Sequence, residues 1–203
     1  MATQYKPLSF NYPMVQALKE RTKTVTRRLQ KPEETPLQVG DLIWIREPYT
    51  SQYSEAHQNW QPIYQADCSQ WEMQQLRFRE NYLMPKKYAR IFLRITKVTE
   101  EYLQDITNQE AIKEGILADL SQSHPVTDVP WCFNYVIKRF LWSTPRESFL
   151  SFFEAIYGMA LVSKNPRVWR YEFEYAERPN SEEFLQDFKI LNITQNQFQT
   201  SNF

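Results

Sequence analysis

Two segments of this sequence concentrate positive charge that can hold phosphate groups. Residues 1–31 carry seven lysines and arginines against one acid, Glu20, and residues 77–97 carry seven against one acid, Glu80. If the two segments meet in the fold, they form a local basic patch on a chain whose formal net charge is zero. The residues that we predict to bind an RNA or nucleoside ligand are Arg21, Arg27, Arg28, Lys86, Lys87 and Arg90.

Both segments can also be explained without a ligand, as charged residues on a solvated surface. Aromatic residues around the second segment could add base stacking, because every base offers a π-face. These residues are Trp60, Trp71, Tyr82 and Tyr88. Such residues more often pack in a core or an insertion, so the sequence leaves both interpretations open.

The composition argues against several other classes of protein. His57 and His124 have no partner at ligand spacing, and Cys68 and Cys132 match no metal site, so we predict no metal and no cofactor. The chain starts without the charged and apolar regions of a secretory signal, and it has no run of about 18 apolar residues. We therefore expect a cytoplasmic protein without a membrane span. Zero net charge predicts weak non-specific binding to duplex DNA at most.

The hydrophobic pattern predicts short strands interrupted by a few helices. We expect strands at residues 6–10, 22–29, 42–45, 61–66, 89–98 and 168–175. We expect helices at residues 12–21, 107–115 and 146–157. The remaining segments include a polar loop at 49–59 and an irregular region at 117–135.

Local signals support the first two helices. Asn11 can cap the first helix, and Pro13 suits its first turn. Thr107 and Glu110 have the spacing of a capping box, and Gly115 stands where a helix-ending glycine belongs.

Residues 21–28, Arg-Thr-Lys-Thr-Val-Thr-Arg-Arg, resemble the ASCH motif G-x-K-x-x-T-x-R. Lys23, Thr26 and Arg28 match the motif, and Arg21 stands in place of its glycine. Four further segments resemble the family in the same order, at residues 40–47, 89–98, 103–116 and 165–169. The resemblance covers about 1–47 and 85–175 and is to the longer, phage-associated members.

The resemblance implies a fold and two activities. ASCH domains resemble PUA domains, which bind RNA, and some small members are amidohydrolases that deacetylate acetylcytidine. Carried across, the catalytic set is Lys23, Thr26 and Glu114. A threonine hydroxyl becomes a nucleophile when a base takes its proton, and a neutral lysine can be that base when neighbouring cations lower its pKa. A glutamate could then protonate the leaving amine.

Two observations bear on this catalytic set. Glu114 lies near a helix C-terminus, where a negative charge is unfavourable by about 0.3–1 kcal/mol, although it could also be an ordinary surface acid. In a regular strand, Lys23 and Thr26 would point to opposite faces. They can share a site only if Lys23 precedes the strand or a bulge intervenes.

Together these patterns predict an α+β fold, a small PUA-like mixed β-barrel of the ASCH type with helical and loop insertions. The domain is expected to span 1–176, with insertions at about 48–84 and 117–158, followed by a polar C-terminal tail at 177–203.

Three functions remain open. The first is binding of RNA or a modified nucleoside in the basic cleft between the 21–28 motif and the helix at 107–116. The second is an amidohydrolase that acts on an acylated cytidine-like nucleoside. The third is a phage or prophage accessory protein that acts through protein contacts, with the barrel as a scaffold.

Overall fold

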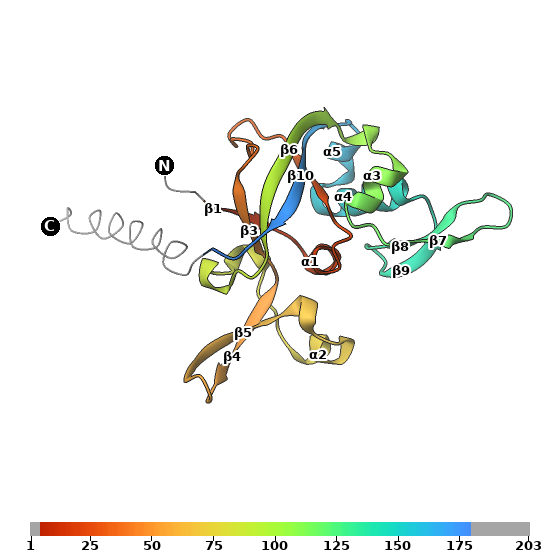
Figure 1. Ribbon diagram of the computed structural model, residues 1–203. Helices are drawn as coiled ribbons and strands as arrows, with labels where there is room; N and C mark the ends of the chain where they lie inside the picture. Colours follow the sequence, from red (N-terminus) through yellow and green to blue (C-terminus); the bar gives the residue numbers. More distant parts are fainter. Residues whose placement is uncertain (1–4, 180–203) are drawn as a thin grey trace. The chain divides into compact units, whose positions relative to one another are not determined.

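The computed structural model describes residues 5–179 as a mixture of short strands and helices (Figure 1). The strands are β1 (Tyr5–Ser9), β2 (Val25–Leu29), β3 (Leu42–Arg46), β4 (Tyr49–Ser54), β5 (Asn59–Tyr64), β6 (Phe92–Tyr102), β7 (Ala118–Ser123), β8 (Pro130–Asn134), β9 (Arg139–Trp142) and β10 (Arg167–Ala176). The α-helices are α1 (Tyr12–Lys19), α2 (Gln70–Gln75), α3 (Asn108–Lys113), α4 (Pro145–Tyr157) and α5 (Met159–Val162). The predicted polar tail lies outside the described residues from position 180 onward.

The strands form an open sheet and two smaller sheets, whereas the sequence predicts a barrel. Hydrogen bonding orders the main sheet β1-β3-β6-β10-β2, and the smaller sheets are β4-β5 and β7-β8-β9. A barrel needs two neighbours for every strand, whereas β1 and β2 have one each within residues 5–179. The predicted mixture of helices and strands is therefore confirmed, but the sheet that they form is not closed.

The chain divides into two compact units. Within the described residues, unit 1 comprises 5–9, 42–93 and 175–179, and unit 2 comprises 10–41 and 94–174. Both units are thus assembled from segments that lie far apart in the sequence.

Unit 1 contains a parallel strand pair and a β-hairpin. Strands β1 and β3 pair from Tyr5 opposite Leu42 to Ser9 opposite Arg46. A cluster of buried residues fills this unit, namely Trp44, Tyr49, Met84, Ala89 and Phe92. The predicted strand at 61–66 is present as β5, shifted by two residues, whereas β4 forms in the segment that is predicted to be a polar loop. The alternation of apolar and polar residues that marks a half-buried strand is weak here, because most residues of β4 are polar.

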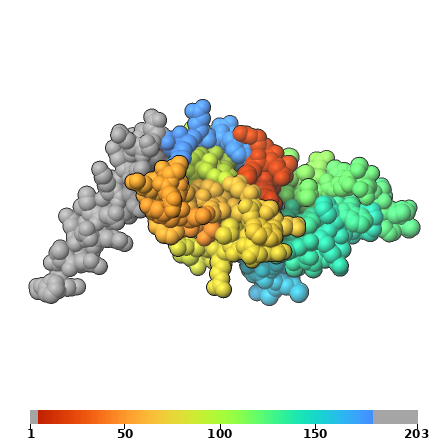
Figure 2. Space-filling view, turned by 90° about the horizontal axis from the view of Figure 1, so that it is seen from below, coloured from red at the N-terminus to blue at the C-terminus, as the bar shows by residue number. Residues whose placement is uncertain are grey.

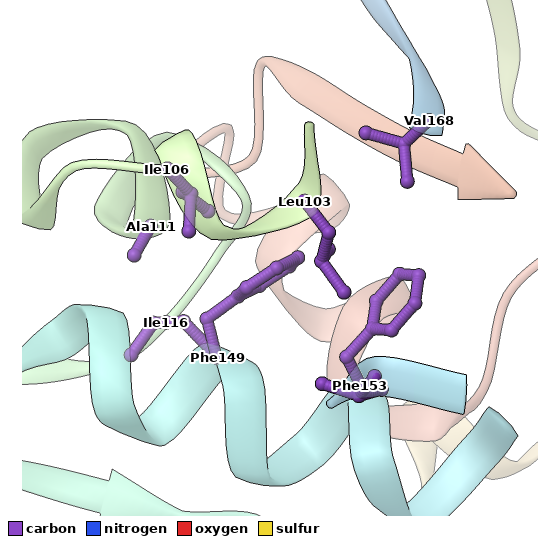
Figure 3. Packing of buried hydrophobic residues seen from close by; sticks show 8 residues of the cluster. Leu103, Ile106, Ala111, Ile116, Phe149, Phe153 and Val168 are labelled. Atoms are coloured by element: carbon purple, nitrogen blue, oxygen red, sulfur yellow. The ribbon is translucent and has the colours of Figure 1, made fainter. Parts of the chain in front are cut away.

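Unit 2 has a larger core, in which helix α4 packs against the segment that precedes α3 (Figure 3). Its buried members are Leu103, Ile106, Ala111, Ile116, Phe149, Phe153, Val162 and Val168. Strands β2 and β10 pair antiparallel in this unit, with Thr26 opposite Tyr171 and Arg27 opposite Arg170. The expectation of an irregular region at 117–135 is wrong, because β7 and β8 form there.

Within the described residues, no helix is long and apolar enough to cross a membrane.

Candidate functional site

Unit 2 brings Lys23 and Glu114 together although they are 91 positions apart in the sequence. The Lys23 Nζ atom lies 2.6 Å from Glu114 Oε2 and 2.7 Å from the backbone oxygen of the same residue. Lys23 is 1% exposed and Glu114 is 3% exposed. Glu114 is therefore not a surface acid, and its carboxylate and the end of helix α3 are both bound by one buried ammonium.

The end of helix α1 determines where Lys23 begins its path into the protein. The N–H of Arg21 donates to Leu18 O at 2.9 Å, and the N–H of Thr22 donates to Ala17 O at 3.0 Å. This pair of hydrogen bonds is a Schellman motif, and it requires a left-handed backbone at the residue after the cap. Arg21 is that residue, with φ of 59°.

The backbone at Arg21 has the conformation that favours glycine, the residue of the ASCH motif at this position. Glycine is favoured at this position because a left-handed residue with a Cβ atom costs about 1–2 kcal/mol. Arg21 keeps the left-handed conformation, and its side chain is exposed at the surface. The Arg21 side chain thus points to solvent and not into the interior that holds Lys23 and Glu114.

We expect Arg21→Gly to raise the free energy of unfolding by about 0.5–1 kcal/mol. The relief of left-handed strain exceeds the extra chain entropy that glycine brings to the unfolded state. Chemical denaturation followed by circular dichroism measures the change. The matched control is Lys19→Gly, inside the last turn of α1, which should lower the stability by about 0.8–1 kcal/mol. Equal losses in the two variants would contradict this interpretation of position 21.

Helix α3 ends in the same motif as α1. The N–H of Gly115 donates to Ile112 O at 2.8 Å, and the N–H of Ile116 donates to Ala111 O at 3.2 Å. Gly115 has φ of 95°, as expected of a glycine that ends a helix. The predicted position of this helix end is confirmed.

Gly115 also lets the two helix ends approach closely. A Cβ atom at this position would lie 2.7 Å from the Cβ of Ala17 and 3.3 Å from the Cβ of Lys23. The hydroxyl of Tyr135 donates to Gly115 O at 2.9 Å and accepts from the N–H of Leu117 at 3.0 Å. The loop after α3 is therefore held from both sides, which places Glu114 against Lys23.

Arg27 joins the Lys23–Glu114 pair to a larger group of charges. Its NH1 atom lies 3.1 Å from Glu114 Oε1, and its Nε atom lies 2.6 Å from Glu101 Oε1. Its NH2 atom lies 3.3 Å from Glu110 Oε2, which also accepts from Arg170 Nε at 2.8 Å. We call these six residues the buried charge cluster, namely Lys23, Arg27, Arg170, Glu101, Glu110 and Glu114.

Burial and pairing shift the pKa values in this cluster. Burial lowers the pKa of Lys23, and contact with Glu114 offsets that effect only in part. Burial alone would raise the pKa of Glu110, but hydrogen bonds from Arg170, Lys113 and Arg27 outweigh it and lower the pKa to about 2. Lys23 thus loses its proton more readily than an exposed lysine, which a general base requires.

Thr26 is the second residue of β2 and is 3% exposed. Lys23 precedes this strand, so the alternation of side chains along β2 does not force the two residues to opposite faces. The segment between them is anchored, because the N–H of Thr24 donates to Lys113 O at 2.8 Å and Thr24 O accepts from Phe173 at 3.2 Å. Lys23 thus precedes the strand, as a shared site requires, but Arg27, and not its neighbour Thr26, contacts Glu114.

The other predicted ligand-binding residues divide between the two units. In unit 2, the Arg28 guanidinium lies 4.7 Å from the centre of the Phe10 ring. In unit 1, Lys86 is 8% exposed and lies 5.5 Å from the Tyr5 ring, whereas Lys87 is exposed. Lys86 therefore offers little of its charge to a ligand in this conformation.

Arg90 belongs to an ion-pair group in unit 1. Its Nε and NH2 atoms each lie 2.8 Å from one oxygen of Glu47, and NH1 pairs with Asp67. Its guanidinium lies 3.7 Å from the centre of the Tyr64 ring. Carboxylates thus already neutralise Arg90, and its guanidinium packs over the Tyr64 ring and helps to hold that ring in place.

An apolar pocket of about 390 Å³ adjoins the ends of both helices in unit 2. Thr22 and Gly115 line it, each next to a residue of the Lys23–Glu114 pair, together with Phe133 and Tyr135. Lys23, Thr26 and Glu114 are not among its lining residues, so access to the pair from this pocket requires side chains to move.

Three members of the buried charge cluster were missed as site residues in the sequence analysis. Glu110 was predicted only as a helix-capping residue, and Glu101 and Arg170 were given no role. The pairing of β2 with β10 places Arg170 directly opposite Arg27. Because of this register, both arginines can reach the carboxylate of Glu110. Register between distant strands cannot be read from local spacing.

Among residues 5–179, no group of three or more histidine, cysteine, aspartate or glutamate side chains is arranged to hold a metal ion. No family model matches this chain, and no curated protein or solved structure matches it either.

Proposed function

We propose that unit 2 binds a modified nucleoside at the Lys23–Glu114 pair, in a PUA-like domain of the ASCH type. The observation that carries the proposal is the 2.6 Å contact between these two buried side chains. Both stand at the positions that the ASCH resemblance assigns to ligand chemistry. Arg21 and Arg28 then lie in the same basic motif as candidates for contact with the phosphates of an RNA that carries the nucleoside.

Stability alone gives little reason for this pair. Replacing a buried ion pair with well-packed apolar residues is often neutral or stabilising, because both charges lose their hydration on burial. Proteins tend to keep such perturbed groups at functional sites, although structural networks also contain them. Lys23 has three N–H donors, and Glu114 accepts from it at two atoms. A carbonyl of the nucleoside can accept from the ammonium once the covering side chains move apart.

Amide hydrolysis is the second candidate, and the lowered pKa of Lys23 favours it. Neutral Lys23 would take the proton of the Thr26 hydroxyl, whose oxygen attacks the carbonyl carbon of the acylated base. Glu114 would protonate the departing amine as the C–N bond breaks, which leaves the acyl group on Thr26 as an ester. Water would then hydrolyse this ester and restore the threonine.

Calorimetric titration with acetylcytidine and cytidine, combined with chromatography of the products, separates binding from hydrolysis. Lys23→Met should weaken acetylcytidine binding by about 10–150-fold, the range for loss of a hydrogen bond to a charged group. Thr26→Val should retain binding and reduce any turnover by at least about 100-fold. The matched control Lys31→Met removes an exposed lysine of unit 2 and should change neither property.

Circular dichroism verifies that each variant is folded before its binding is interpreted. Wild-type protein that neither binds nor hydrolyses acetylcytidine would contradict both candidates. Binding without turnover would remove the enzyme candidate and leave the nucleoside site.

A further inference from the structure

A groove of about 640 Å³ in unit 1 is lined by aromatic rings, amides and cations. We propose that this groove binds single-stranded nucleic acid by stacking bases on its rings. The site goes beyond the nucleoside site of unit 2, because no residue is common to the two. Its rings and cations are Tyr53, Trp60, Tyr64, Tyr88, Lys87 and Arg178.

Two of these aromatic side chains are exposed on the hairpin of β4 and β5. Trp60 is 59% exposed and Tyr53 is 50% exposed. They are cross-strand partners, and their rings meet edge to face with centres 5.9 Å apart. The hairpin is part of the surface coloured orange in Figure 2. Large apolar rings left open to water, beside cations, are the surfaces on which unpaired bases stack.

Hydrogen bonds hold the inner wall of the groove rigid. The Tyr64 hydroxyl donates to Tyr88 O at 2.6 Å, and the Tyr88 hydroxyl donates to Trp60 O at 3.4 Å. Arg90 lies over the Tyr64 ring and is itself bound at two atoms by Glu47. A fixed aromatic wall loses little side-chain entropy when a base stacks on it, which favours binding.

The cations that line the groove are enough to contact only a few phosphates. Lys87 and Arg178 line it and are exposed, whereas Arg90 is neutralised by its carboxylate partners. Two phosphate contacts predict a salt slope of about −1.4 for a single strand. The amides of Gln58 and Gln61 also line the groove and can hydrogen-bond to base edges.

Base stacking also distinguishes single strands from duplexes. A duplex keeps its base faces stacked inside the helix, so only its backbone could reach these rings. The groove has too few cations to bind a duplex by phosphate contacts alone. We therefore expect the ligand to be unpaired RNA or DNA, and the experiment compares the two.

The test measures fluorescence anisotropy of labelled ten-nucleotide oligo(U), oligo(dT) and a duplex with the full chain. Wild type should bind one or both single strands more tightly than the duplex. Trp60→Ala should weaken single-strand binding about 5–150-fold, which corresponds to one stacked base. The matched control Trp71→Ala removes a tryptophan of unit 1 that is 68% exposed and does not line the groove, and it should bind as wild type does.

Two further variants make the result specific. Lys87→Met should lower the salt slope by about 0.7, the share of one phosphate. Saturating acetylcytidine, the ligand of the nucleoside site, should leave oligonucleotide binding unchanged, so failure of one proposal is distinguishable from failure of the other. The inference would be overturned if the wild-type protein bound no single strand, or if Trp60→Ala and Trp71→Ala lost the same affinity. It would also be overturned if the groove bound a proline-rich peptide and no oligonucleotide.

Discussion

Glu114→Gln is expected to lower the free energy of unfolding by about 3–5 kcal/mol, the cost of removing one partner from a buried ion pair. The amide would leave Lys23 with a neutral partner at 2.6 Å and would also remove the charge that faces Arg27 at 3.1 Å. Both cations have side chains that are 1% exposed, so water cannot replace the carboxylate. Urea unfolding followed by circular dichroism measures the loss.

Two controls show whether the effect comes from uncompensated charge. Glu101→Gln removes another carboxylate partner of Arg27, but its side chain is 24% exposed and water can hydrate the site, so the loss should be smaller. The double variant Lys23→Met, Glu114→Gln should recover part of the loss, because it removes one of the two stranded cations. A loss below about 1 kcal/mol in Glu114→Gln would mean that the pair contributes no more than a surface ion pair.

Gly115→Ala is expected to lower the free energy of unfolding by about 3 kcal/mol, through two separate causes. The left-handed backbone at this position, with φ of 95°, costs a residue with a Cβ atom about 1–2 kcal/mol. The new methyl group would also lie 2.7 Å from the Cβ of Ala17, and the shift that relieves such a contact costs about 1–3 kcal/mol. The same shift would move Glu114 relative to Lys23.

Gly158→Ala is the control for a Cβ atom at a residue of positive φ without a steric clash. Gly158 has φ of 89°, and a Cβ atom there would meet nothing within 4 Å. This variant should therefore lose about 1–3 kcal/mol through its backbone conformation alone and should retain nucleoside binding. Similar losses and similar binding in the two variants would show that the approach of the two helix ends does not matter.

The sequence predicted the elements whose signals are local. Asn11 caps α1 by accepting from the N–H of Met14 at 3.4 Å, and Gly115 follows the end of α3 where its type suggested. Strand β3 is a continuous apolar run, so its burial and limits followed from composition. Such features depend on residues within one or two turns of each other.

Features that depend on distant pairing could not be predicted in the same way. Strands β4 and β7 are polar along much of their length, so their partners, and not their own periodicity, make them strands. The open order of the main sheet likewise follows from which strands pair. The contact between Lys23 and Glu114 was expected only through the ASCH resemblance, since the two residues are 91 positions apart in the sequence.

Side-chain roles were the least predictable part of the site. The sequence suggested that Lys86 and Arg90 are surface cations. Lys86 is instead buried, and the guanidinium of Arg90 is already paired with carboxylates. Arg21 differs from the motif glycine in side chain and yet keeps the backbone conformation that glycine favours. A one-letter pattern records neither burial, nor partners, nor φ.

NMR of the Lys23 side chain shows whether the Lys23–Glu114 pair is a ligand site. The Lys23 CH₂ group next to the ammonium, assigned by comparison with Lys23→Met, is followed during titration with acetylcytidine. If the pair binds the nucleoside, this signal should shift saturably; cytidine should cause only a weak shift, and Lys31, an exposed reference, should show none. An unchanged Lys23 signal at millimolar acetylcytidine, in a folded protein, would contradict binding at this pair.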